Sequence, residues 1–174
     1  MDAYTQLLES YGDRLLNPAH GSAGDAFDPW TEALAALAES FVEKRVGELK
    51  RALPLTIRAA PSVLVRYRRF LMARPSSDDP GVYTPGLAEG LRAWSTLRAE
   101  LAADAREAEY APWILDYELT LGASRADGAP RHLHAPVPLH ELVEVLVGGL
   151  RPTEPEPGPG WEYRFADRVR WRRR

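Results

Sequence analysis

The sequence predicts an α+β fold, with a mostly helical N-terminal bundle followed by a small C-terminal antiparallel sheet that carries one helix. Three observations support this prediction. Apolar residues recur at helical spacing between residues 30 and 105, residues 161–174 alternate with period two, and Pro- and Gly-rich stretches separate the segments. We expect a helical domain over residues 1–125 and a strand–helix–hairpin unit over residues 126–174, packed as one compact protein.

Most of the expected helices begin at a proline or at a short polar cap, which are the usual N-terminal signals. In chain order they span residues 2–16, 28–53, 54–60, 62–74, 84–105 and 139–150. Pro54 either kinks the second of these helices or opens the third. Residues 111–121 are ambiguous, because alternating apolar and polar residues indicate a strand, whereas Pro112 as a first helical residue indicates a helix.

The last stretch, WEYRFADRVRWRRR over residues 161–174, predicts a β-hairpin. A three-residue turn at 166–168 places Tyr163 opposite Trp171 and gathers the aromatic residues on one face. A two-residue turn would place Tyr163 opposite Arg170 and mix the faces, so the pattern favours the longer turn.

The other face of this hairpin pairs Glu162 with Arg172 and Arg164 with Arg170. Like charges directly opposite each other destabilise a sheet, so the arginine pair indicates a surface that binds an acidic or hydrogen-bonding partner. The alternative is a solvated arginine tail that keeps a sheet edge soluble.

Residues 131–139 predict a further strand, with His132 and His134 on one face and prolines at 136 and 138 that confine it to a sheet edge. Two histidines side by side occur in some metal sites, and His140 is the nearest third ligand. Three or four ligands are usual, so we expect no metal in this chain.

The helix after Pro61 carries a basic run, RYRRFLMAR, in which Arg66 and Arg69 are predicted to face outward. These arginines either form a phosphate- or peptide-binding face or pair internally with acidic segments. Residues 1–40 hold seven acidic residues against one basic residue, residues 41–74 hold nine basic against two acidic, and the net charge is −3. This segregation predicts acidic-on-basic docking or a charged partner, and the overall charge is unlike that of a general nucleic-acid binder.

The composition excludes several classes of protein. The chain of 174 residues is long enough to form a hydrophobic core without stabilising disulfides or metal ions. It holds no cysteine, so disulfides, thiolate zinc sites and cysteine nucleophiles are excluded. The acidic N-terminus is unlike a signal peptide, and no apolar run approaches the length of a membrane span. We therefore expect a bacterial cytoplasmic protein without a membrane partner.

The order of segments resembles the partner subunits of multinuclear non-haem iron oxidases, the accessory proteins of methanobactin- and bufferin-type peptide pathways. The resemblance covers roughly residues 45–174 and is one of layout. It comprises Leu53-Pro54 before a helix that ends RYRRFLMARP, then LAEGLRAWSTL, a Pro-Trp segment followed by LDYELTL, VPLHEL, a Pro-rich spacer and a terminal strand pair containing VRW. In that family the segment matching 112–121 is a helix, so we adopt the helix there.

The resemblance implies a non-catalytic subunit that holds no cofactor, because the partner oxidase carries the iron. This subunit forms a heterodimer with the oxidase and recruits the leader of a ribosomally made precursor peptide. The family usually has a fuller first strand, so the prolines at 136 and 138 leave open which sheet edge accepts the peptide. The alternative functions are a nucleic-acid-binding regulator and a scaffolding domain.

The residue pattern offers no catalytic constellation, so we predict that the chain is not an enzyme. The residues assigned to peptide binding are Arg164, Arg170, Arg172, Arg131, His132 and His134, and those assigned to the oxidase partner are Arg66 and Arg69.

Overall fold

The protein is described by a computed structural model that covers residues 29–73, 81–156, 158 and 160–174. Within them lie six helices and a three-stranded antiparallel sheet, so the predicted α+β class is confirmed. The elements are α2 (Pro29–Ala52), α3 (Pro54–Ala59), α4 (Val63–Ala73), α5 (Pro85–Ala103), α6 (Ala111–Asp127), β1 (Arg131–Ala135), α7 (Leu139–Val147), β2 (Trp161–Phe165) and β3 (Arg170–Arg173). The predicted helix over residues 2–16 lies outside the described residues.

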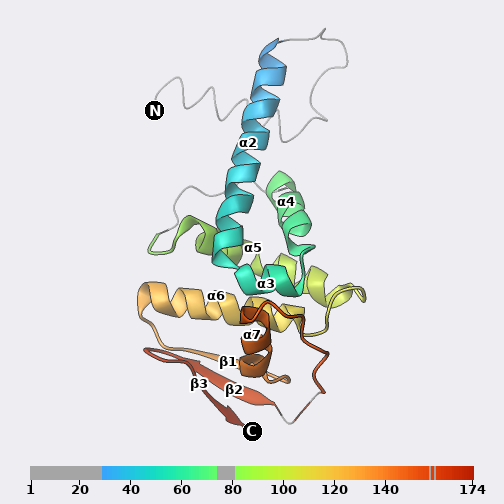
Figure 1. The fold of residues 1–174 in the computed structure, drawn as a ribbon. Coiled ribbons are helices and arrows are strands. Elements are labelled where there is room, and N and C mark those ends of the chain that lie inside the picture. Colours follow the sequence, from blue (N-terminus) through green and yellow to red (C-terminus); the bar gives the residue numbers. More distant parts are fainter. Residues whose placement is uncertain (1–28, 74–80, 157, 159) are drawn as a thin grey trace.

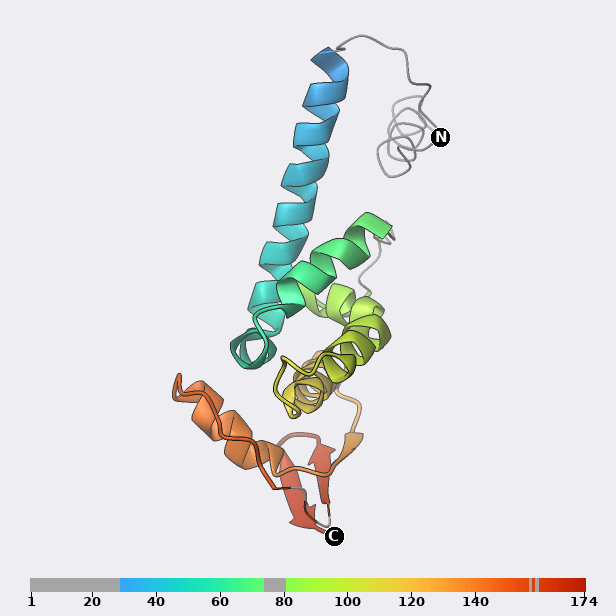
Figure 2. The ribbon, with the colours of Figure 1, turned by 90° about the vertical axis from the view of Figure 1, so that its right-hand side faces the viewer.

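The helices α2 to α5 form a body from which the N-terminal half of α2 projects, α6 lies between this body and the sheet, and α7 lies on the sheet side of α6 (Figures 1 and 2). Prolines in the first turn of α3, α5 and α6 favour the starts of these helices, because a proline fixes φ and its missing N–H is not needed there. Pro54 opens a short new helix rather than a kink. The core contains fully buried side chains from α2, α5 and α6, among them Leu49, Leu97, Leu101, Ile114 and Leu115.

Residues 111–127 form a helix, so the period-two interpretation of this segment is wrong and the helix implied by the resemblance is correct. The alternation of apolar and polar residues does not indicate a strand here, because neighbouring elements cover most of the circumference of α6. Its polar residues are therefore buried, and they form hydrogen bonds with donors on other helices. Asp116 accepts hydrogen bonds from Trp94 Nε1 at 2.6 Å and from Arg98 Nε at 2.8 Å. Gly122 does not end the helix, which stops at Gly128 in the left-handed region at φ 70°.

Glu118 on α6 supplies a long-range cap for α3. Its carboxylate accepts from the backbone N–H groups of Leu55 at 2.8 Å and Thr56 at 2.6 Å, and from Thr56 Oγ1 at 2.7 Å. The carboxylate thereby satisfies backbone donors in the first turn of a helix that lacks a local side-chain cap. Burial nevertheless raises the pKa of Glu118 above its usual value, against the opposing effect of the hydrogen bonds.

The strands lie in the order β1-β2-β3, and the hairpin has the predicted register. Tyr163 lies opposite Trp171, and Arg164 lies opposite Arg170, so the three-residue turn is confirmed. β1 is an edge strand as predicted but ends at Ala135 rather than at residue 139, because Pro136 and Pro138 cannot continue a ladder. The helix predicted over 139–150 ends at Val147, before a glycine pair.

The inner face of the sheet packs on the helical body through aromatic rings. Tyr163 and Phe165 are fully buried, and both meet Tyr117 of α6 edge to face, with ring centroids 6.3 Å and 5.3 Å apart. On α7, His140 Nδ1 lies 3.1 Å from the hydroxyl oxygen of Tyr163. The sheet is therefore held by α6 and α7 together, while the two-part division at residue 125 stays a prediction.

Candidate peptide-binding sheet

The outer face of the sheet carries five of the six residues that the sequence assigned to peptide binding. Cross-strand pairing arranges them, together with Glu162, in two rows that each cross all three strands. One row consists of His134, Glu162 and Arg172, and the other consists of His132, Arg164 and Arg170. We call these the acidic row and the arginine row.

The acidic row is internally paired. Glu162 accepts hydrogen bonds from Arg172 Nε at 2.7 Å and from its Nη2 at 2.5 Å. The hydrogen bond from Arg172 lowers the pKa of Glu162. His132 Nδ1 lies 3.8 Å from the same carboxylate and links the two rows.

The arginine row has an excess of positive charge. Arg164 and Arg170 lie directly opposite each other, both are exposed, and neither forms an ion pair or a side-chain hydrogen bond within the part of the chain that the structure describes. Two like charges at this spacing disfavour each other, and a carboxylate placed between or beside them would relieve that repulsion. The arginine row can therefore bind an acidic group.

Arg131 does not belong to this face. It pairs with Phe165 in the ladder, and its guanidinium forms an ion pair with Asp127 of α6 and a hydrogen bond of 3.4 Å to the Tyr83 hydroxyl. A hydrogen bond from the Ala129 backbone N–H, with Arg131 as a further cause, lowers the pKa of Asp127. Arg131 thus fixes the α6–β1 junction, away from the other five residues, and its assignment to peptide binding stays a prediction.

His140 lies on the opposite side of the sheet from His132 and His134, so the three cannot form one metal site. Its ring stacks on Trp171 with centroids 4.7 Å apart at 20° and meets Trp161 edge to face at 4.6 Å. No cluster of three or more histidine and acidic side chains with metal-binding geometry occurs among the described residues. The sequence offered His140 only as a possible ligand and gave no sign of this aromatic contact.

In each edge strand, β1 and β3, the backbone N–H and C=O groups of alternate residues point away from β2. Arg174 N donates to Gly160 O at 3.1 Å, which fixes the alternation of the β2–β3 ladder. Residues 170, 172 and 174 therefore bond to β2, whereas the N–H and C=O groups of Trp171 and Arg173 point away from the sheet. By the same alternation, His132 and His134 point their backbone groups outward from β1.

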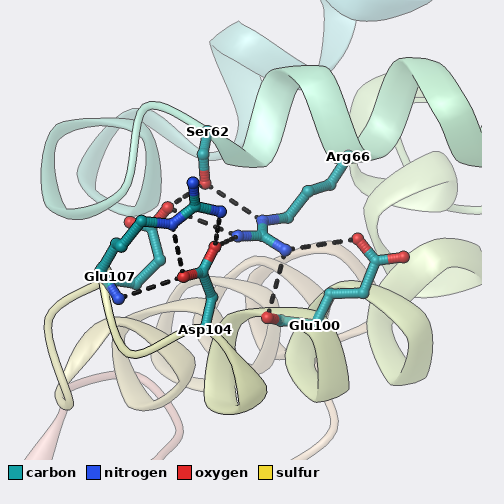
Figure 3. A network of polar contacts seen from close by, with 6 residues as sticks. Ser62, Arg66, Glu100, Asp104 and Glu107 are labelled. Carbon is teal, nitrogen blue, oxygen red and sulfur yellow. Dashed lines mark hydrogen bonds and ion pairs between the residues drawn. The ribbon is translucent and has the colours of Figure 1, made fainter.

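The residues assigned to the oxidase partner lie on α4 and are in different environments. The prediction that Arg66 faces outward is wrong, because its guanidinium lies between α4 and α5 among carboxylates (Figure 3). Its nitrogens lie 2.7 Å from Asp104, 3.5 Å from Glu107 and 3.5 Å from Glu100. Arg69 is exposed as predicted.

Internal pairing also accounts for much of the basic run. Arg68 forms ion pairs with Glu39 and Glu43 of α2, so the basic helix binds acidic residues of this chain, as one of the two interpretations expected. Sequence spacing could not reveal the partners of Arg66, because they lie on another helix more than thirty residues away.

Comparisons of the chain with protein-family models, with curated proteins and with solved structures give no match. The resemblance to oxidase partner subunits therefore stays a prediction from layout. None of the described helices combines the length and the apolar character needed to cross a bilayer.

Acid is expected to weaken the α4–α5 contact through Asp104. Hydrogen bonds from the side chain and backbone of Arg106, and then from Arg66, hold the pKa of Asp104 well below its usual range. A lowered folded-state pKa means that the stabilisation is present above the unfolded value of about 4 and is lost as pH falls through the folded value. The difference in urea midpoint between the wild type and Asp104→Asn is therefore expected to shrink between pH 5 and pH 2.

Glu109 provides the matched control for this titration, because its exposed carboxylate forms no ion pair within the described residues. Glu109→Gln is expected to follow the wild-type profile. A constant difference between the wild type and Asp104→Asn at all pH values would contradict the prediction.

Proposed function

We propose that this chain is the non-catalytic partner subunit of an iron-dependent peptide-modifying oxidase, and that it recruits the leader of a ribosomally made precursor peptide at its C-terminal sheet. The observation that supports this best is that one small sheet combines a strand edge that pairs with no other described strand and two opposed arginines, Arg164 and Arg170, that form no ion pair within the described residues. Main-chain hydrogen bonds along the edge would supply affinity, and the arginines would supply selectivity. The proposal places the protein in the cytoplasm, where such a precursor is first available.

The same geometry disfavours a nucleic-acid-binding regulator. A phosphate backbone needs several free cations along one surface. Arg66 and Arg68 already bind carboxylates of α5 and α2, and Arg172 binds Glu162. Among the cations that form no ion pair within the described residues, Lys50, Arg51 and Arg69 lie on the helices α2 and α4, whereas Arg164 and Arg170 lie opposite each other on the sheet. The cross-strand spacing of that pair suits a peptide strand.

A charge reversal in the arginine row tests the proposed function. The proposal expects genes for an iron-dependent oxidase and a short precursor beside the gene for this chain. The tagged chain is co-expressed with these two products, and both are expected to co-purify with it. Arg164→Glu places a carboxylate opposite Arg170, so the fold is retained while the row loses its positive charge. Peptide capture, measured by fluorescence anisotropy, is expected to weaken about fivefold or more, since an exposed ion pair contributes up to about 1 kcal/mol and the reversal adds repulsion.

Arg69→Glu makes the same change of charge on α4, far along the chain from the sheet. It is expected to weaken association with the oxidase and to leave peptide capture unchanged. If the chain binds neither the oxidase nor the precursor but binds a DNA duplex with an affinity that depends steeply on salt, it acts as a nucleic-acid-binding regulator.

A further inference from the structure

The β1 edge is closed to an added strand beyond His134. The next outward-pointing position is Pro136, which has no N–H to donate. Its carbonyl oxygen already accepts a hydrogen bond from Gly158 N at 3.2 Å, so the segment that follows α7 covers this end of the edge. An extended peptide beside β1 would find only two residues with free backbone groups.

The β3 edge has no such obstruction within the described residues. Trp171 and Arg173 both carry a backbone N–H and a C=O that point away from β2, and the preceding Val169 is also not a proline. All four residues of β3 are exposed, and no described helix packs against their side chains apart from the His140 ring on Trp171. Between the two edges, β3 is the one that can accept an extended peptide.

The side chains of β3 define what such a peptide must carry. A strand added beside β3 continues the pleat, so its residues next to Arg170 and Arg172 lie on the outer face, and the residue between them lies next to Trp171 on the inner face. Arg170 faces Arg164 and has no carboxylate partner among the described residues. A peptide carboxylate next to Arg170 would supply that partner.

The inner position calls for a different side chain. The Trp171 ring is 50% exposed even though one of its faces stacks on His140. An apolar side chain next to it would cover exposed indole surface that the protein itself leaves open. Parallel and antiparallel addition both place side chains on alternate faces, so the requirement does not depend on the direction of the peptide.

We propose that the β3 edge binds an extended peptide segment in which acidic side chains flank an apolar one, with the acidic residues on the outer face next to Arg170 and Arg172 and the apolar residue on the inner face next to Trp171. This inference rests on the proposed function and specifies its substrate. It assigns the side-chain selectivity to Arg170 and Trp171, and the backbone pairing to Trp171 and Arg173.

The test uses the full chain at 0.15 M salt and three fluorescein-labelled peptides of equal length. One contains Glu-Leu-Glu-Leu-Glu, the second has the same residues in blocks as Glu-Glu-Glu-Leu-Leu, and the third contains Lys-Leu-Lys-Leu-Lys. We expect the alternating acidic peptide to bind at least about fivefold more tightly than either of the others. An N-methylated version of the alternating peptide, which lacks the bonding amide hydrogens, is expected not to bind.

Two variants and a control locate the site. Arg170→Glu is expected to lower the affinity for the alternating acidic peptide about fivefold or more and to raise the affinity for the lysine peptide. Trp171→Ala is expected to lower the affinity for both peptides. Arg168→Glu makes the same change of charge in the turn, outside the strand that the peptide would pair with, and is expected to have a smaller effect than Arg170→Glu.

Several results would overturn the inference. Equal losses for Arg168→Glu and Arg170→Glu would show only general charge attraction, and unchanged binding of the N-methylated peptide would exclude strand addition. A dimer that Trp171→Ala dissociates would mean that the edge binds a second copy, and an oligonucleotide that displaces the peptide at equal concentration would favour nucleic acid. If the native precursor still binds the oxidase complex while Arg170→Glu has no effect, the side-chain assignment is wrong but the proposed function stands.

Discussion

A Gly86→Ala variant is expected to lose much of the stability of the helical body. A Cβ atom at Gly86 would lie 2.2 Å from the carbonyl oxygen of Glu48 and 2.6 Å from its carbonyl carbon. Both are backbone atoms of α2, so no side chain can rotate out of the way and the two helices must separate. This separation would open the core around Leu49 and Leu53, which are fully buried. We expect the free energy of unfolding to fall by about 3 kcal/mol or more, which is a large share of the roughly 5–15 kcal/mol that is usual for a folded protein.

Two other glycines make the test specific. At Gly90 the nearest atom to an added Cβ is Leu119 Cδ2 at 2.8 Å, and this side chain can move, so Gly90→Ala is expected to cost less. At Gly47 in α2 nothing lies within 4 Å, so Gly47→Ala is expected to stabilise the protein by about 1 kcal/mol through helix propensity. Urea unfolding followed by far-UV circular dichroism would rank the three. A Gly86→Ala midpoint equal to that of the wild type would contradict the close approach of α2 and α5.

The sequence predicted what depends on local chemistry. Proline at the first helical position marked the starts of α3 and α5, because the effect of proline on φ and on its own N–H needs no distant partner. The register of the hairpin followed from side-chain alternation together with one turn length. The pairing of Arg164 with Arg170 was predictable for the same reason, since cross-strand neighbours are fixed once the register is fixed.

What the sequence could not predict depends on partners that lie far along the chain. Asp116 and Glu118 looked like the solvent face of a strand, but they bind donors on α5 and α3. Arg66 looked like a surface cation, but its partners lie on and after α5. The closure of the β1 edge follows partly from Pro136, which the sequence shows, and partly from the backbone hydrogen bond that Gly158 donates to Pro136, which no residue pattern indicates.

A Phe165→Ala variant is expected to detach the sheet from α6. Phe165 is fully buried, and its ring lies 5.3 Å from that of Tyr117. Removing a buried phenylalanine costs about 3–5 kcal/mol, because contacts are lost and a cavity remains. Urea unfolding is expected to report that loss, and native-state hydrogen exchange is expected to show β2 amides exchanging faster than those of α5. Phe165→Leu, which keeps most of the volume, is expected to cost less than about 1.5 kcal/mol.

The comparison with Trp171→Ala separates support of the sheet from contact with the peptide. Phe165 faces the helical body and cannot touch a strand added beside β3, whereas Trp171 is half exposed at that edge. Phe165→Ala is therefore expected to lower peptide capture only as far as it lowers the folded population of the sheet. Trp171→Ala is expected to lower capture with little loss of stability. If instead both variants change stability and capture in the same proportion, Trp171 acts by holding the sheet against His140, and the peptide contact assigned to its ring would have to move elsewhere on β3.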